Sequence, residues 1–231
     1  MRWVQTAASI PWKLDFANST HRWIVYGKYE GAAFLNWAKN FLPRNGIVID
    51  SGANIGQMSL YFSQFVPDGK VLAFEPGPVS ADWLEECVSA NALNNIEVIR
   101  LALGAEELDL SLQEPGVETK HGAQNHISES GGVPVKVVKL CDQVARRGID
   151  RIDLWKLDVE GYEYEALQGA ASLLQRKTIR ALYVEIQDAL QSKIIQYLRE
   201  YDYTSYNISY RGQAKTSNRF SSHAMALFLP N

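Results

Sequence analysis

The sequence predicts a doubly wound α/β fold built on one mostly parallel sheet. Segments with the composition of buried strands alternate with segments of helical periodicity, and this alternation is typical of a parallel sheet covered on both faces. The first clear strand, Ile47–Ile49, runs into an acid and a glycine-rich turn, Asp50–Gly56, which leads into a helix. At 231 residues the chain fits one domain, 1–231, with 1–46 as an aromatic-rich cap segment and 47–231 as the core.

The remaining elements follow from periodicity and from turn residues. The expected strands are Val71–Phe74, Ile96–Arg100, Leu108–Leu112, Val133–Val138, Ile152–Asp158, Ile179–Ile186, Tyr203–Ile208 and Ala224–Leu229. The expected helices are Tyr29–Phe41, Ile55–Phe65, Val79–Ala92, Leu140–Arg147, Tyr162–Leu174 and Asp188–Glu200. We interpret Leu108–Leu112 and Val133–Val138 as an antiparallel extension of the sheet, and the polar segment Glu114–Gly132 between them as a loop. We expect irregular structure up to about Tyr26.

The composition limits the functional class. A formal charge of −3 and a pI near 5.8 argue against a nucleic-acid-binding surface, which is usually basic. No apolar stretch approaches the ~18 residues needed to span a bilayer, so we expect no membrane segment. Cys87 and Cys141 form no C-x-x-C pair, and a secretory signal is lacking, which favours a cytoplasmic protein with reduced thiols. The four histidines lack zinc-ligand spacing.

Gly52 and Gly56 lie in the turn after the first strand. Glycine lets the backbone turn sharply and approach a ligand closely, and the helix that follows directs its free N–H groups into the same turn. Asn54 stands where the G-x-G-x-x-G dinucleotide fingerprint has its middle glycine. The next strand ends at Glu75, where an acid can accept hydrogen bonds from a ribose diol. These residues predict a nucleotide-binding turn of a kind other than the usual NAD-binding one.

Four segments, taken in order, carry a family resemblance. They are Val48–Gly56, Ala73–Pro78, Asn95–Gly104 and Leu154–Glu163, the last of which contains K-x-D-V-E-G-x-E. From about Tyr29 to Ile186 the chain resembles the FkbM-like family of class I methyltransferases that use S-adenosyl-L-methionine. Ser51 and Tyr162 depart mildly from the pattern, because small or apolar residues are commoner there.

The resemblance implies a Rossmann-like sheet with an antiparallel last strand and methyl transfer from S-adenosyl-L-methionine. The implied acceptor is a hydroxyl of a sugar, polyketide or similar small metabolite. The residues expected to bind the cofactor are Asp50, Gly52, Asn54, Gly56, Glu75 and Pro76, with Ala102 and Leu103 framing the adenine ring. We expect acceptor selectivity to lie in Met1–Glu30 and Glu114–Gly132.

Asp158, Glu160 and His126 are the candidate catalytic residues. The proton of an alcohol acceptor must leave as the new C–O bond forms, and a carboxylate or histidine within reach can accept it. Asp158 shares one side of its strand with Lys156, so a buried ion pair of Lys156 with Asp158 or Asp50 is the structural alternative. Glu160 also suits the ordinary role of a charge at a helix N-terminus.

A metal-dependent mechanism is a further alternative. Asp158 and Glu185 lie at the ends of neighbouring expected strands, where Mg²⁺ can polarise an acceptor hydroxyl. Because Lys156 competes for the first carboxylate and only Glu160 or Asp188 offers a third ligand, we predict a site without metal. Three other interpretations stay open, namely an NAD-dependent oxidoreductase, a non-catalytic protein that binds S-adenosyl-L-methionine, and methylation of an amine.

Overall fold

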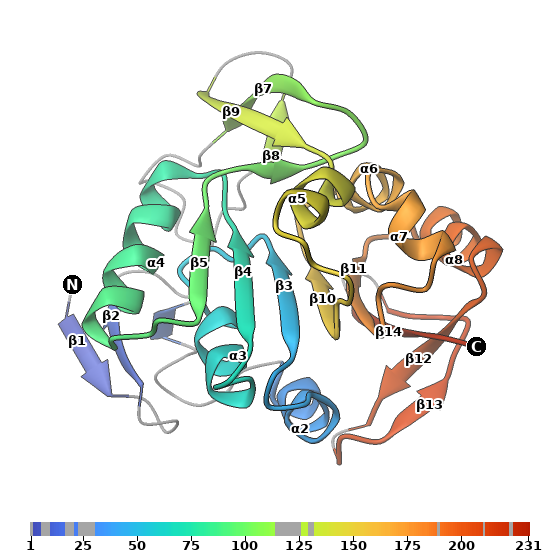
Figure 1. Cartoon of the computed structure of the whole chain (residues 1–231), viewed down its shortest axis with the longest axis horizontal. Coiled ribbons are helices and arrows are strands. Elements are labelled where there is room, and N and C mark those ends of the chain that lie inside the picture. The colour runs from blue at the N-terminus through green and yellow to red at the C-terminus, as the bar shows by residue number, and fades with distance from the viewer. Residues whose placement is uncertain are drawn as a thin grey trace.

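The computed structural model describes residues 2–5, 10–16, 21–22, 31–113, 126–128, 132–188, 190–209, 211–221 and 224–231. An eight-stranded sheet in the order β13-β12-β14-β11-β10-β3-β4-β5 forms its centre (Figure 1). The strands are β3 Ile47–Ser51, β4 Lys70–Phe74, β5 Ile96–Ile99, β10 Leu154–Leu157, β11 Leu182–Ile186, β12 Tyr203–Ile208, β13 Ala214–Thr216 and β14 Ala224–Pro230. The strands from β5 to β11 are parallel, whereas β14 runs antiparallel between β11 and β12. This confirms the expected sheet with its antiparallel last strand.

Helices cover both faces of the sheet, which explains why its central strands are apolar at nearly every position. Val48 of β3 packs with α2 and α3, whereas the next residue, Ile49, packs with the helices from α5 to α8. The described helices are α2 Ala32–Phe41, α3 Ser59–Phe65, α4 Pro78–Ala90, α5 Leu140–Arg146, α6 Glu163–Gln168, α7 Ala171–Gln175 and α8 Gln191–Glu200. None of them is long and apolar enough to cross a membrane.

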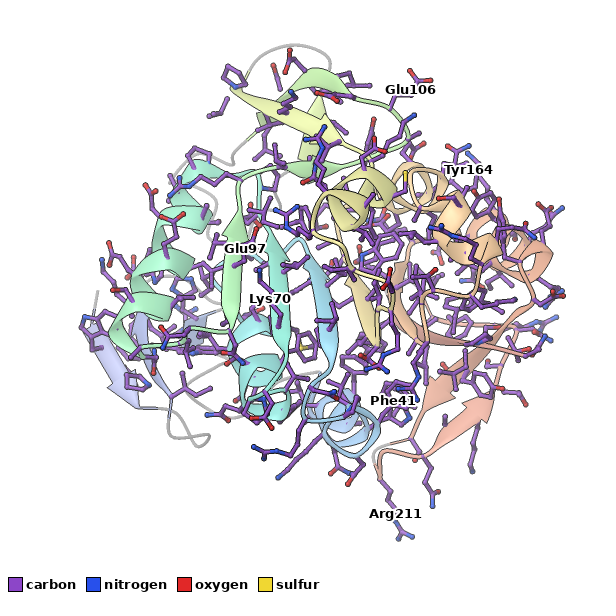
Figure 2. All side chains as sticks on the ribbon, in the orientation of Figure 1. Phe41, Lys70, Glu97, Glu106, Tyr164 and Arg211 are labelled. Carbon is purple, nitrogen blue, oxygen red and sulfur yellow. The ribbon has the colours of Figure 1, made fainter. Side chains whose placement is uncertain are left out.

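Polar contacts fix the β5 edge of the sheet. Figure 2 shows Lys70 of β4 near Glu97 of β5, and their charged atoms are 2.5 Å apart. Arg147, directly after α5, donates to the same carboxylate at 2.7 Å. These half-buried charges connect the edge strand to both its neighbouring strand and a covering helix.

A second sheet corrects the expectation of an extension. It has the order β6-β9-β7-β8, with β6 Ala102–Leu103, β7 Leu108–Gln113, β8 His126–Ser128 and β9 Val133–Val138. Because β5 leads almost directly into β6, the second sheet lies beyond the carboxyl end of β5, and Figure 1 shows it near α5 and α6. The antiparallel pairing of β7 with β9 is as expected, but it takes place outside the main sheet.

Positive φ angles explain one difference between the expected and observed helices, and a close backbone approach accompanies a second. α3 begins at Ser59 rather than Ile55, because Asn54 and Gly56 have φ of +50° and +89° and leave the helical region. The expected helix Tyr162–Leu174 is divided into α6 and α7. Gly169 lies at the division, where a Cβ atom would be 1.9 Å from the carbonyl oxygen of Gly104.

The amino-terminal segment contains regular structure that the sequence did not indicate. β1 Arg2–Gln5 and β2 Pro11–Leu14 form an antiparallel pair. Trp12 of β2 is buried, and the ring nitrogen of Trp83 in α4 donates to the carbonyl of Lys13. The amino-terminal part of the expected helix Tyr29–Phe41 lies outside the described residues, and α2 begins at Ala32.

Candidate active site

The glycine-rich turn passes between the ends of β4 and β10. The N–H groups of Gly52 and Ala53 both donate to the carbonyl of Phe74 at 3.0 Å, which ties the turn to the last residue of β4. Gly52 has φ +71°, and a Cβ atom there would be 1.8 Å from the carbonyl oxygen of Asp158. Only glycine permits this approach, so the turn and the segment after β10 are in backbone contact.

Glu75 holds the turn from the end of β4. Its two carboxylate oxygens accept hydrogen bonds from the N–H of Asn54 at 2.7 Å and of Gly77 at 2.8 Å. Burial raises the pKa of Glu75, while these backbone donors and Lys156 act in the opposite direction. A carboxylate has about four acceptor positions, so two protein contacts leave capacity for a ligand.

Lys156 is a buried cation between the ends of β3 and β10. Its Nζ is 3.4 Å from Oδ1 of Asp50 and 3.3 Å from Oδ2 of Asp158. It also donates to the carbonyl of Gly52 at 2.9 Å and to that of Ser51 at 3.3 Å. Burial by itself lowers the pKa of Lys156, but the two carboxylates outweigh it and the pKa is raised. The ion pair considered as the structural alternative is therefore present with both acids.

The two acids paired with Lys156 differ in exposure. Asp50 is fully buried and accepts a hydrogen bond from the hydroxyl of Ser59 at 2.6 Å, so it supports the turn from inside the sheet. The Asp158 side chain is 34% exposed. The ion pair thus leaves part of Asp158 accessible to a ligand.

A tight loop, Asp158–Tyr162, joins β10 to α6. Glu160 and Gly161 have φ of +57° and +97°, and a glutamate in this region is uncommon. Oε1 of the buried Glu163 accepts hydrogen bonds from the N–H of Val159 at 3.0 Å and of Gly161 at 3.1 Å. Glu163 thus holds the loop that presents Asp158 and Glu160. Its signal in the sequence is an acid at the first position of a helix, a common place for a group that binds free backbone N–H groups.

Carboxylates cluster around Glu160. Burial, followed by repulsion from Asp158, Glu185 and Glu163, raises the pKa of Glu160 to about 8. Glu185, at the end of β11, is buried and accepts a hydrogen bond from the Gln187 amide at 3.2 Å. A strained backbone and a shifted pKa at the carboxyl edge of a parallel sheet are both typical of functional sites.

Residues 50–205 match the profile of the family described as the Methyltransferase FkbM domain. The chain belongs to this family. It is similar to Methyltransferase sdnD of Sordaria araneosa, with 34% identity over 159 residues, and to 2-O-methyltransferase NoeI of Sinorhizobium fredii, with 26% identity over 166 residues. These matches cover 55% and 62% of this chain and 61% and 63% of the relatives. The chain thus spans about three fifths of the length of these curated relatives.

A solved structure supports the fold of this FkbM domain. The FkbM methyltransferase of Methylobacillus flagellatus KT aligns with a TM-score of 0.56 and 17% identity, over 86% of this chain and 47% of that chain. At this identity the likeness concerns the fold alone.

In the FkbM domain, most of the expected cofactor-binding residues lie at the carboxyl ends of β3 and β4. Gly52, Asn54 and Gly56 form the turn, and Glu75 and Pro76 follow β4. A Cβ atom on Gly56 would be 2.4 Å from Leu84 of α4, so this glycine serves helix packing. The two residues expected near adenine, Ala102 and Leu103, form β6 and are buried. Contact of any of these residues, or of the buried Asp50, with a cofactor stays a prediction.

The remaining expected residues are His126 and the acids considered as metal ligands. His126 begins β8, inside the segment expected to be a loop, and its backbone pairs with Gln113. Its side chain lies outside the described structure, so its catalytic role stays a prediction. Among the described residues, no three His, Cys, Asp or Glu side chains are grouped so as to hold a metal ion. The carboxylate of Asp158, a ligand in the alternative with a metal, is paired with Lys156.

Proposed function

We propose that this FkbM domain transfers a methyl group from S-adenosyl-L-methionine to a hydroxyl oxygen of a small, sugar-like or polyketide-like acceptor. The observation that carries this proposal is the joining of the glycine-rich turn, Glu75 and the Asp158–Tyr162 loop at one edge of the sheet. In open α/β sheets, ligands bind beyond the carboxyl ends of the strands, where these three features meet.

On the cofactor side, the proposal assigns the ribose hydroxyls to Glu75 and the close backbone approach to Gly52. Two backbone N–H groups already orient the Glu75 carboxylate, so little conformational freedom is lost when a ligand binds. When bound, S-adenosyl-L-methionine supplies a methyl group that its sulfonium already activates. The protein then contributes mainly alignment of the acceptor and exclusion of water.

On the acceptor side, we assign different roles to Asp158 and Glu160. Asp158 Oδ2 lies 3.3 Å from the Lys156 ammonium and its side chain is partly exposed, which suits a group that accepts a hydrogen bond from the acceptor hydroxyl and orients it. Glu160, with a pKa raised to about 8, is a stronger base than an ordinary carboxylate once it is ionised, which suits uptake of the hydroxyl proton at a pH near or above that value.

The acceptor class is supported by the chemistry of the site and by one relative. An alcohol needs a group that removes its proton, and the cluster around Glu160 offers such a group. The relative NoeI is by name a 2-O-methyltransferase. An amine acceptor in its unprotonated form is already nucleophilic, so it needs such a group less than an alcohol does.

Calorimetry with S-adenosylhomocysteine and with NAD tests the cofactor assignment. We expect the first to bind and the second not to bind, because Asn54 replaces the middle glycine of the dinucleotide fingerprint. Release of S-adenosylhomocysteine is then measured with neutral glycosides, uronates, hydroxylated polyketides and primary amines. Failure to bind S-adenosylhomocysteine overturns the proposal, and turnover of amines alone overturns the acceptor class.

A further inference from the structure

The buried ammonium of Lys156 has more oxygen atoms around it than N–H donors to offer them. Four oxygen atoms lie within 3.4 Å of Lys156 Nζ, from Gly52, Ser51, Asp158 and Asp50. A lysine ammonium has only three N–H donors. Asp50 Oδ1, which is buried, has no hydrogen-bond partner of suitable geometry. The oxygens therefore compete for the donors of Lys156.

The competing oxygens belong to functionally different parts of the molecule. The Gly52 carbonyl is part of the glycine-rich turn, at which we propose that the cofactor binds. The Asp158 carboxylate is partly exposed, on the proposed acceptor side. The sheet places Lys156 directly beside Asp50 in the register of β10 with β3, and the lysine side chain is only 6% exposed, so its ammonium stays among these oxygens. A change in one contact must therefore redistribute the others.

We propose that Lys156 is a positioning residue that couples the cofactor-binding turn to Asp158. This inference rests on the proposed function, because it assumes that S-adenosyl-L-methionine binds at the turn. A ligand bound at the turn changes how the N–H donors of Lys156 are divided between the Gly52 carbonyl and the Asp158 carboxylate. A change at Asp158 alters this division in return. Coupling between two binding sites is reciprocal by thermodynamic necessity.

The opposite end of β10 provides a matched control. Asp153 is fully buried there and pairs with Arg180, with Oδ1 and Nη1 2.8 Å apart. Like Lys156, Arg180 compensates a buried carboxylate, but it lies at the amino end of the strand, away from the turn. The Arg180 side chain is 45% exposed and shares Asp153 with Arg151, so Arg180→Met reports on the weakening of an ion pair without a role at the site.

The test is a double-mutant cycle on S-adenosylhomocysteine affinity, measured by calorimetry in the full chain. We expect Asp158→Asn to change the dissociation constant by about fivefold or more, the lower range of typical coupling. The same substitution should have no effect in a chain that carries Lys156→Met. In the Arg180→Met chain, melting should occur at a lower temperature, whereas the affinity and the full effect of Asp158→Asn should be retained.

An equal effect of Asp158→Asn with and without Lys156 overturns the coupling. If Lys156→Met does not fold, the cycle is run with Lys156→Gln. The ¹⁵N signal of the Lys156 ammonium in the wild-type chain gives a readout without any lysine variant, and an identical response to S-adenosylhomocysteine in wild type and Asp158→Asn also overturns the coupling. Absence of S-adenosylhomocysteine binding to the wild type is a different result, because it overturns the proposed function itself.

Discussion

Glu75 connects the glycine-rich turn to β4 and, in our proposal, to the cofactor ribose. Losing a charge-assisted hydrogen bond of this kind costs about 1.5–3 kcal/mol. We therefore expect Glu75→Ala to weaken S-adenosylhomocysteine binding more than about tenfold in calorimetry. Glu107→Ala removes an exposed carboxylate paired with Lys136 and should leave the affinity unchanged. Equal affinity of Glu75→Ala and wild type would falsify the ribose assignment.

Glu160 makes stability depend on pH, and the sign follows from its raised pKa. In the folded chain the pKa of Glu160 is about 8, so the group is mostly uncharged at lower pH. A glutamate in the unfolded chain ionises near the ordinary pKa of a glutamate side chain. The folded state thus binds more protons between these values, and its stability decreases as pH rises through about 8. Glu160→Gln should raise the melting temperature more at about pH 9 than at about pH 5.

The control for this experiment is Glu165→Gln, on the first turn of α6. It also removes one carboxylate near the start of α6, so it controls for the loss of a negative charge in this region. If Glu160→Gln and wild type lose stability in parallel between about pH 5 and pH 9, then Glu160 does not titrate with a raised pKa. In that case its assignment as the proton acceptor loses its support.

At the scale of elements, the contact between the turn and the β10–α6 loop depends on a missing side chain. Gly52→Ala adds a Cβ atom 1.8 Å from a carbonyl oxygen, in a region of positive φ. We expect a loss of about 2–5 kcal/mol, which combines backbone strain with overpacking. Gly148 also has positive φ, at +62°, but has nothing within 4 Å, so Gly148→Ala measures the strain alone.

Chemical denaturation of the two alanine variants gives the comparison. Gly52→Ala should lower the unfolding free energy clearly more than Gly148→Ala and should also weaken S-adenosylhomocysteine binding. Similar losses in the two variants would show that the turn can move away from Asp158 without cost. The close approach would then be no constraint on the site.

The sequence predicted the strands whose local residue pattern is strong. It did not predict the arrangement of strands that depends on contacts between residues far apart in the chain. β3 and β4 could be located from the sequence because buried parallel strands form apolar runs that end in turn residues. The second sheet was misplaced because nothing in Leu108–Gln113 or Val133–Val138 specifies which sheet they join. That choice follows from β6, a two-residue strand that pairs with β9 and is too short to detect by alternation.

At the scale of the whole molecule, the amino-terminal β1–β2 pair packs onto the core. Trp12 is buried with Leu14 against Ile55, Leu60 and Cys87. Truncation of a buried tryptophan costs about 3–5 kcal/mol, and each kcal/mol lowers the melting temperature by about 2–4 °C in a chain of this size. We expect Trp12→Ala to melt in one cooperative transition at a clearly lower temperature.

Trp3→Ala, in the same strand pair, is the matched control, because Trp3 is 49% exposed and should matter little. Calorimetry distinguishes the possible outcomes. A separate early transition in Trp12→Ala, with the main transition unchanged, would show that the amino-terminal pair unfolds independently. The expectation of a single domain would then be wrong.

The sequence by itself determined the class of sheet, the glycine-rich turn and the acids at the strand ends. These features are local, because periodicity, turn chemistry and a strand followed by an acid are encoded by neighbouring residues. The tertiary structure decided that Lys156 pairs with Asp50 and Asp158 together, that Glu163 holds the loop, and that Gly52 contacts the segment after β10. Each of these depends on the register of β10 beside β3 or on the path of a loop, and both are set by long-range packing.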